Sequence, residues 1–264
     1  MAVFPVTVGV VALQGAFVEH IALLRRAVDA SPSLAARPFT FLQVRNADEL
    51  ARCDALIVPG GESTTLALVA ARSGLLEPLR TFVRVEKKPT WGTCAGLILL
   101  AEQVDAAKEG GQALIGGLDV RVRRNHFGRQ INSFERDVDM PFLAAGSDAS
   151  NPDNSGIVPS GPSPTPFRAV FIRAPVVSEV LEHGASNEAG SVVDGQSPGV
   201  GAPPVQVLSR LDGTGSTGGN IVAVRQGNIF GTSFHPELTD DVRVHAWWLQ
   251  QAVQSIDRSR LAAA

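Results

Sequence analysis

Three short apolar segments, each followed by a turn that contains glycine, constrain the fold of this chain most. They are residues 6–13 before Gln14-Gly15, residues 55–58 before Pro59-Gly60-Gly61, and residues 89–91 before Gly92. Segments with helical patterns alternate with them, at residues 17–28, 64–71, 75–85 and 97–102. Short apolar strands that alternate with helices are typical of a parallel sheet covered by helices.

The second half of the chain has a different pattern. Residues 120–123, 169–172, 205–208 and 221–225 have the composition of strands, and no helical segment separates them. A last strand at residues 229–233 leads into His235-Pro236-Glu237, and a helix is expected at residues 242–256. We therefore expect antiparallel strands or hairpins added to the parallel sheet.

Two segments, residues 144–166 and 184–204, are dense in glycine, serine, proline, asparagine and aspartate and poor in large apolar side chains. We expect both to be surface loops inserted between structured segments. No other segment has the composition of a linker, and 264 residues with 44% hydrophobic side chains suffice for one sizeable core. The sequence therefore predicts a single domain over residues 1–264.

Charge and cysteine content narrow the class of protein. The formal net charge is −3 and the basic residues form no run, so nothing favours binding to nucleic acid or to an anionic membrane. Two cysteines make a disulfide framework improbable and favour a reducing compartment. The apolar start of the chain lacks the pattern of a signal peptide, and no apolar segment reaches transmembrane length. We expect a cytoplasmic protein.

The segment Gly92-Thr93-Cys94-Ala95-Gly96 lies between an expected strand and an apolar helix. Small residues around a central cysteine are typical of a nucleophile elbow, a sharp turn that holds the nucleophile clear of the sheet. A thiol at a helix N-terminus also favours its reactive thiolate form. A lone cysteine is more often a small buried hydrophobic residue, and that is our interpretation of Cys53, which has no such surroundings.

A cysteine nucleophile needs a base and a third group that orients the base. His235 and Glu237 supply both, directly after the last expected strand. Because the carboxyl ends of parallel strands share one edge of the sheet, His235 can meet Cys94 there. A His-Pro pair alone is usually an ordinary turn, so the hypothesis depends on both segments. The other histidines have weaker claims and lack metal-ligand spacing: His20, His126, His183 and His245.

Residues 59–65, Pro-Gly-Gly-Glu-Ser-Thr-Thr, again join a strand end to a helix. Paired glycines allow backbone N–H groups to approach a ligand, and Ser63 or Thr64 could cap the helix. One N–H group here and that of Ala95 could form an oxyanion hole. A tight turn with a helix cap would use the same residues. The segment lacks the spaced glycines and the Lys-Ser/Thr pair of a phosphate-binding loop.

Together these segments resemble the class I, or triad, glutamine amidotransferases, and among them the glutaminase subunits of pyridoxal 5′-phosphate synthases. The resemblance covers nearly the whole chain. It implies a three-layer, flavodoxin-like α/β fold with a mixed, mostly parallel central sheet flanked by helices. The motifs that carry it are Ala12-Leu13-Gln14-Gly15, residues 59–65, residues 92–97, Arg124-Asn125 with Phe127-Gly128-Arg129-Gln130, residues 171–175 and residues 233–238.

The resemblance also implies roles for individual residues. Cys94 would be the nucleophile, His235 the general base and acid, and Glu237 the carboxylate that orients it. Guanidinium groups suit an α-carboxylate, although without the resemblance both arginines of the motifs would be taken for solvated surface residues. No metal and no organic cofactor would be needed. Glutamine would contact Gly61, Glu62, Ser63, Arg124, Ile172 and Arg173, and the N–H groups of Gly61 and Ala95 would form the oxyanion hole.

The activity that the resemblance implies is hydrolysis of L-glutamine to L-glutamate and ammonia. The ammonia would pass to a pyridoxal 5′-phosphate synthase subunit, which in this family forms a large ring decorated by glutaminases and makes vitamin B6. Ammonia is protonated in neutral water, which is a physical reason for direct transfer. Three alternatives remain open: an amidotransferase subunit of another pathway, a stand-alone cysteine hydrolase or peptidase, and a non-catalytic scaffold subunit with the same fold.

Overall fold

The computed structural model describes residues 4–105, 112–127, 133–144, 165–181, 203–211 and 219–262. Nearly all of the two expected surface loops, at residues 144–166 and 184–204, lie outside the described residues. The same holds for the Gly128-Arg129-Gln130 part of one motif and for His183. Both elements of the predicted elbow and the whole His-Pro-Glu segment lie within them.

One half of the central sheet is parallel, as the apolar segments predict. Its strands run in the order β2, β1, β3, β4, β12, and each pair of neighbours is parallel. The residues of β3, β4 and β12 are all buried, because helices cover both faces of the sheet there. The bounds are β1 Val6–Val11, β2 Phe39–Val44, β3 Ala55–Val58, β4 Thr90–Thr93 and β12 Ile229–Thr232.

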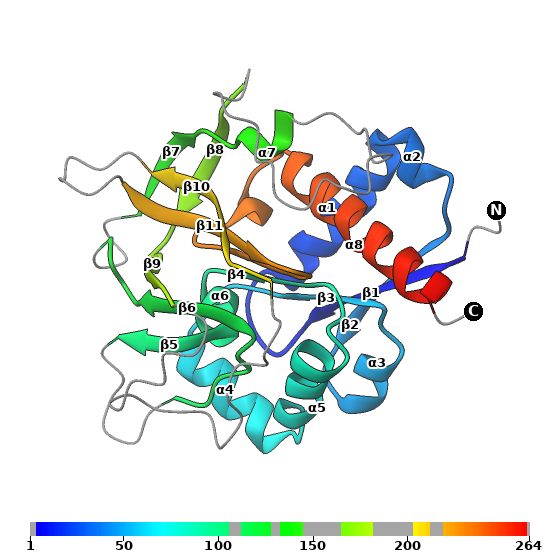
Figure 1. Ribbon diagram of the computed structural model, residues 1–264, viewed down its shortest axis with the longest axis horizontal. Helices are drawn as coiled ribbons and strands as arrows, with labels where there is room; N and C mark the ends of the chain where they lie inside the picture. Colours follow the sequence, from blue (N-terminus) through cyan, green and yellow to red (C-terminus); the bar gives the residue numbers. More distant parts are fainter. Residues whose placement is uncertain are drawn as a thin grey trace.

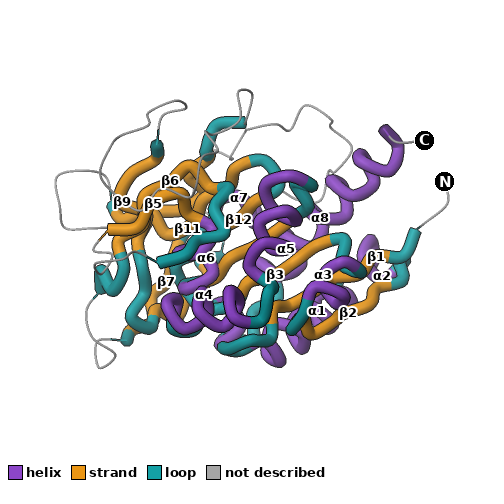
Figure 2. Tube along the Cα trace, turned by 90° about the horizontal axis from the view of Figure 1, so that it is seen from below, coloured by secondary structure: helices purple, strands orange, loops and turns teal. Residues whose placement is uncertain are grey.

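The other half of the sheet is largely antiparallel, which confirms the expectation for the second half of the chain. Strand β11 pairs antiparallel with β12, β9 and β10, and β9 pairs antiparallel with β6. Strand β5 closes the edge, parallel to β6. In Figure 2, β5, β6 and β9 gather at the end of the molecule opposite both chain termini. The bounds are β5 Ala101–Asp105, β6 Leu118–Arg123, β9 Val176–Val180, β10 Gln206–Leu211 and β11 Asn220–Gln226.

Two layers of helices enclose the sheet (Figure 1). Helices α1, α2 and α8 lie on one side of it, and α3, α4 and α5 lie on the other. Each layer has its own apolar core, one around Leu24 and Trp248 and the other around Leu66 and Leu79. The bounds are α1 Phe17–Ala30, α2 Pro32–Ala35, α3 Ala47–Ala51, α4 Ser63–Arg72, α5 Leu76–Arg80, α6 Ala95–Leu100, α7 Pro141–Ala144 and α8 Arg243–Ala262.

Some expectations for the elements were incomplete or wrong. The helix expected at residues 97–102 ends at Leu100, and β5 follows at once. The reason is tertiary: the Glu102 carboxylate accepts hydrogen bonds from Gly117 N, at 2.7 Å, and from Arg84 Nη1, at 2.9 Å. These bonds fix residue 102 against its neighbours in an extended strand. The helix expected at residues 75–85 is α5 followed by a π-helical turn, Thr81–Val85.

The strand expected at residues 169–172 belongs to a different sheet from the others. It is β8, Phe167–Phe171, and it pairs antiparallel with β7, Phe134–Val138, in a separate two-stranded sheet. Strand β2 was not predicted, because the adjacent apolar residues Phe41 and Leu42 interrupt the alternation of apolar and polar side chains along it. Both β8 and the turn after it reach the carboxyl edge of the parallel strands, as described below.

Helix α6 packs unusually close to β3. A Cβ atom on Gly96 would overlap the backbone carbonyl group of Val58. A Cβ on Gly92 would lie 2.6 Å from the carbonyl oxygen of Gly96. Backbone atoms cannot move aside like the tip of a side chain, so this approach of helix to sheet depends on glycine at both positions.

We predict that Gly96→Ala lowers the thermal unfolding midpoint by more than Gly74→Ala. Overpacking against backbone costs about 1–3 kcal/mol or more. Gly74 has φ +70° and no atom within 4 Å of an added Cβ, so alanine there costs only the left-handed backbone, about 1–2 kcal/mol. Calorimetry of both variants measures the difference. An equal or smaller loss for Gly96→Ala would contradict the close packing of α6 on β3.

Candidate active site

Cys94 lies on the sharp turn between β4 and α6, as the elbow motif predicts. Its backbone has φ 48° and ψ −102°, a strained conformation for a residue other than glycine. The amide N–H of Cys94 donates to the carbonyl oxygen of Thr232 at 2.8 Å, which ties the turn to the end of β12. Cys94 is buried, with 5% of its surface exposed. The strained turn aims the thiol along the carboxyl edge of the sheet.

His235 and Glu237 meet Cys94 at that edge. The His235 backbone N–H donates to Val170 O of β8 at 2.8 Å, which holds the segment after β12 in place. Nδ1 of His235 lies 2.8 Å from Oε1 of Glu237, and the ring also shares a hydrogen bond with the Cys94 side chain. The structure therefore brings together the three residues that the sequence pairs as nucleophile, base and orienting carboxylate.

The electrostatics of these groups favour charge separation. Burial lowers the pKa of His235, but its hydrogen bonds with Cys94 and Glu237 outweigh burial and raise the pKa to about 10. Burial alone would raise the pKa of Glu237, but His20 and His235 beside it hold that pKa below its ordinary value. A protonated imidazole between the Cys94 side chain and an ionised carboxylate is the arrangement expected of a nucleophile, its base and the carboxylate that orients the base.

Gly60 leaves the space in which these side chains meet. A Cβ at this position would overlap the imidazole of His235 and lie 3.4 Å from Cβ of Cys94. Gly15, at φ +87°, approaches Gly60 in turn, and a Cβ on Gly15 would overlap the Gly60 carbonyl oxygen. The paired glycines of residues 59–65 pointed to close backbone approach, but the sequence did not single out Gly60 itself.

The turn after β3 carries three predicted substrate contacts, and one expectation for it was wrong. Glu62 caps α4, where it accepts hydrogen bonds from Thr65 N at 2.6 Å and Thr64 N at 3.2 Å, in place of Ser63 or Thr64. Ser63 is buried and its hydroxyl donates to Oε1 of Gln112 at 3.1 Å. Gly61 has φ +146°, and a Cβ there would lie 3.3 Å from Cδ of Gln14.

Arg124 reaches the same turn from the end of β6. Its Nη1 donates to Oε1 of Gln112 at 3.1 Å and to Oγ1 of Thr64 at 3.4 Å. Ser63 and Arg124 therefore converge on one amide oxygen. Gln112 was not predicted as part of the site, and nothing in its local sequence indicates it.

The turn after β8 supplies the remaining predicted contacts. The carbonyl oxygen of Ile172 lies 4.0 Å from Sγ of Cys94, and Arg173, exposed and at φ 47°, follows it. Ala95 is the first residue of α6, so its N–H group directly follows the cysteine. The predicted site residues thus come from five separate segments, after β3, β4, β6, β8 and β12.

Sequence reasoning passed over two histidines that reach this site. Nε2 of His20 lies 3.4 Å from Oε2 of Glu237, and Nδ1 of His20 lies 3.0 Å from Nε2 of His245. Both histidines are fully buried. His20 falls on the apolar face of α1 beside Ile21 and Leu24, and a polar residue on such a face is the one signal that could have marked it.

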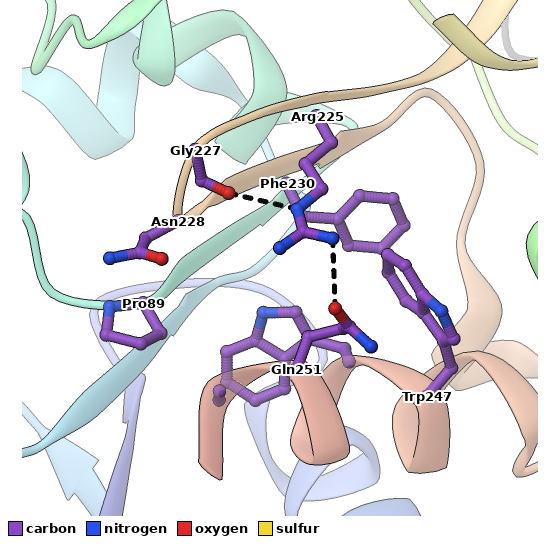
Figure 3. Close-up of a pocket in the computed structure, with 9 residues that line it drawn as sticks. Pro89, Arg225, Gly227, Asn228, Phe230, Trp247 and Gln251 are labelled. Atoms are coloured by element: carbon purple, nitrogen blue, oxygen red, sulfur yellow. Dashed lines mark hydrogen bonds between the residues drawn. The ribbon is translucent and has the colours of Figure 1, made fainter. Parts of the chain in front are cut away.

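A separate pocket lies at the opposite, amino ends of β4 and β12 (Figure 3). Arg225 lines it and already donates to Gly227 O and Gln251 Oε1, both at 2.9 Å. Cys94 lies at the other, carboxyl end of these strands, so the pocket is separate from the candidate active site.

In the described part of the chain, no three His, Cys, Asp or Glu side chains are placed to hold a metal ion. No described helix is long and apolar enough to cross a membrane.

The mixed sheet and the Cys-His-Glu arrangement at its carboxyl edge fit the class of glutamine amidotransferases. The model of the SNO glutamine amidotransferase family matches residues 10–254, and the chain belongs to this family. It is 44% identical over 246 residues to the probable pyridoxal 5′-phosphate synthase subunit PDX2 of Arabidopsis thaliana, covering 92% of this chain and 85% of that protein.

Two further relatives agree. The pyridoxal 5′-phosphate synthase subunit PdxT of Acidothermus cellulolyticus is 43% identical, with 92% of this chain and 91% of that protein covered. A crystal structure of a glutamine amidotransferase superimposes with a TM-score of 0.65 at 35% identity, and the match covers 93% of this chain and 98% of that one. The expected fold class is therefore confirmed.

We predict that Glu237→Gln lowers the pKa of His235 by at least about one unit. A hydrogen bond to a charged group contributes about 1.5–3 kcal/mol, and one pKa unit corresponds to about 1.4 kcal/mol. NMR titration of the His235 imidazole measures the shift. Asp240→Asn is the control, since Asp240 is exposed and pairs with Arg26. An unchanged pKa in Glu237→Gln would contradict the pairing.

The same pKa shift predicts how stability depends on pH. Because the pKa of His235 is raised on folding from 6.5 to about 10, its contribution to stability is fully present below pH 6.5. That contribution is lost as the pH rises toward 10. Denaturant unfolding of the wild type and of Glu237→Gln should therefore differ more at pH 6 than at pH 10, and a difference that grows with pH would contradict this sign.

Proposed function

We propose that this chain is the glutaminase subunit of a pyridoxal 5′-phosphate synthase. It would hydrolyse L-glutamine to L-glutamate and ammonia and pass the ammonia to the synthase subunit for vitamin B6 biosynthesis. The observation that carries the proposal is the contact of Cys94, His235 and Glu237 at the edge of the sheet. The names of the relatives, which are pyridoxal 5′-phosphate synthase subunits, support the choice of pathway.

In the proposed mechanism the Cys94 thiolate attacks the side-chain amide carbon of glutamine. The N–H groups of Gly61 and Ala95 stabilise the oxyanion that forms. His235 donates a proton to the leaving nitrogen, which departs as ammonia and leaves a glutamyl thioester on Cys94. Water, deprotonated by His235, then attacks the thioester and releases glutamate and the free cysteine. Glu237 holds the imidazole in the required orientation throughout.

The proposed glutamine site lies between the turns after β3, β6 and β8. Gly61, Glu62, Ser63 and Ile172 would contact the substrate, and Arg124 and Arg173 would bind its α-carboxylate. Ser63 and Arg124 already share one acceptor, the Gln112 amide oxygen, which supports their placement around one small polar ligand. The guanidinium of Arg124 suits a carboxylate because its N–H groups form a planar fork.

The partner, the domain organisation and the compartment are parts of the same proposal. The partner is a ring-forming synthase subunit that accepts ammonia, which protects the ammonia from protonation in water. One central sheet takes strands from residue 6 to residue 232, which supports a single domain over residues 1–264. Two cysteines, both free, support a reducing compartment, and we propose the cytoplasm.

We predict that Cys94→Ser abolishes glutamate formation, lowering kcat by roughly a thousandfold or more, because a serine hydroxyl is not ionised by this site. Cys53→Ser is the matched control. Cys53 is buried and its thiol donates to Glu49 O at 3.3 Å, so the Cys53→Ser protein should keep its glutaminase activity. Glutamate release is measured with and without the synthase subunit. Activity that survives Cys94→Ser would refute the nucleophile.

The same assay separates the competing functions. The proposed function predicts glutamine hydrolysis that the synthase subunit stimulates. Turnover of peptides or esters by the chain alone would instead support a stand-alone cysteine hydrolase. Glutaminase activity that no synthase subunit stimulates would support an amidotransferase of another pathway, and no activity in any assembly would support a scaffold subunit.

We predict that Arg124→Gln raises KM for glutamine about tenfold or more and changes kcat by less than that. Loss of a charged hydrogen bond to a non-reacting carboxylate weakens substrate and transition state alike. Arg123→Gln is the control, because this exposed neighbour pairs with Asp105. A KM equal to that of the wild type would remove Arg124 from the substrate site.

A further inference from the structure

Two buried histidines extend the line of contacts that begins at Cys94. Beyond Glu237 stands His20 of α1, with Nε2 3.4 Å from Oε2 of the carboxylate. Beyond His20 stands His245 of α8, with Nε2 3.0 Å from Nδ1 of His20. Helices α1 and α8 lie side by side on the same face of the sheet (Figure 1). The contacts therefore run from the catalytic edge into the core between two helices.

Beside that line, the histidine pair contacts one indole ring and one hydroxyl group. The ring of Trp91 contacts both imidazoles edge to face. Its centroid lies 5.6 Å from that of His20 and 4.9 Å from that of His245. The hydroxyl of Thr93 lies 3.4 Å from Nε2 of His20. Burial of two imidazoles in such a place costs free energy that two apolar side chains would not. A packing role alone does not account for them.

The charge of each histidine and the position of its ring proton determine which group donates each hydrogen bond. Burial lowers the pKa of both histidines, so both are neutral and carry one ring N–H each. The titratable groups that act on His20 are Glu237, His235 and Glu19, with His245 on its other side. If His20 carried its proton on Nδ1, the lone pair of Nε2 would face the ionised carboxylate.

The favourable tautomers are therefore the Nε2–H forms of both residues. His245 then donates to Nδ1 of His20, and His20 donates toward Oε2 of Glu237. Among the described residues, Nδ1 of His245 has no hydrogen-bond partner, which costs less for a lone pair than for a buried N–H group. Oε1 of Glu237 pairs with His235, whereas its buried Oε2 has no hydrogen-bond partner among the described residues and lies 3.4 Å from Nε2 of His20.

We propose that His20, held by His245, is a positioning residue for the glutaminase reaction. It fixes the carboxylate of Glu237 through its second oxygen, and Glu237 in turn orients His235 toward Cys94. This inference rests on the proposed roles of Cys94, His235 and Glu237. Neither His20 nor His245 touches the substrate; both act through Glu237, as the outer partners of catalytic groups do elsewhere.

The test compares His20→Asn with His20→Gln. The Gln side-chain amide nitrogen reaches the place of Nε2 and keeps a donor toward Glu237, whereas the Asn amide nitrogen reaches only the place of Nδ1. We expect His20→Asn to lower kcat about tenfold, and His20→Gln to restore most of it. Loss of the donor raises the pKa of Glu237, so the acid limb of the kcat/KM profile moves up by about one pH unit in His20→Asn.

A matched control separates positioning from stability. Ile256→Ala removes buried apolar contacts from α8, the helix that carries His245, and should lower the unfolding midpoint without moving the acid limb. If His20→Asn leaves the pH profile of the wild type unchanged, or if His20→Gln is no more active than His20→Asn, the positioning role is wrong.

A second measurement needs no variant and no activity. Long-range ¹H–¹⁵N correlation spectra of the histidine-labelled wild type at pH 7 report the tautomer of each imidazole. We expect the Nε2–H form at His20 and His245, and an Nδ1–H form at His20 would overturn the inference. Because this readout is independent of glutamine turnover, a protein without glutaminase activity would refute the proposed function and still leave the hydrogen-bond direction testable.

Discussion

The parallel pairing of β4 with β12 is the interaction on which the site depends. It places Thr93 opposite Thr232 and lets the N–H of Cys94 bond to the Thr232 carbonyl oxygen at 2.8 Å. Two segments about 140 residues apart in the chain thereby end at the same edge of the sheet, where Cys94 and His235 follow. Any change in this register would move the two side chains apart by a residue length, roughly 3.3 Å. The pairing of β4 with β12 brings the two side chains together, and the remaining contacts then fix their orientation.

Close backbone approach is the second requirement, and it limits which residues can surround the cysteine. Gly60, Gly92 and Gly96 each lie where a Cβ would overlap a neighbouring group, of the site, of α6 and of β3 respectively. Together they allow the elbow, the turn after β3 and the His235 ring to occupy one small volume. The strained φ of Cys94 is tolerated there because the ladder on one side and α6 on the other fix the chain.

The antiparallel half of the sheet adds what the parallel half lacks. The triad arrangement needs only β4, β12 and the short segment after it, whereas the predicted substrate contacts Arg124 and Ile172 follow β6 and β8. Strand β8 pairs outside the main sheet, yet its Val170 carbonyl holds the backbone of His235. Different strands therefore contribute different members of the candidate site, in a chain that belongs to the SNO glutamine amidotransferase family.

The sequence by itself determined the local chemistry of this protein. Cysteine between small residues, His-Pro-Glu after a strand and a double glycine before a helix are patterns of adjacent residues, so the elbow, most strands and the grouping of Cys94, His235 and Glu237 were predictable from them, whereas the substrate contacts were expected only from the family resemblance. The tertiary structure alone decided that Glu62 caps α4, that residues 101–105 form a strand, that Gln112 joins Ser63 to Arg124, and that His20 and His245 stand behind Glu237. Each of these depends on contacts between segments that strand order and helix packing bring together, and the local sequence does not specify which segments those are.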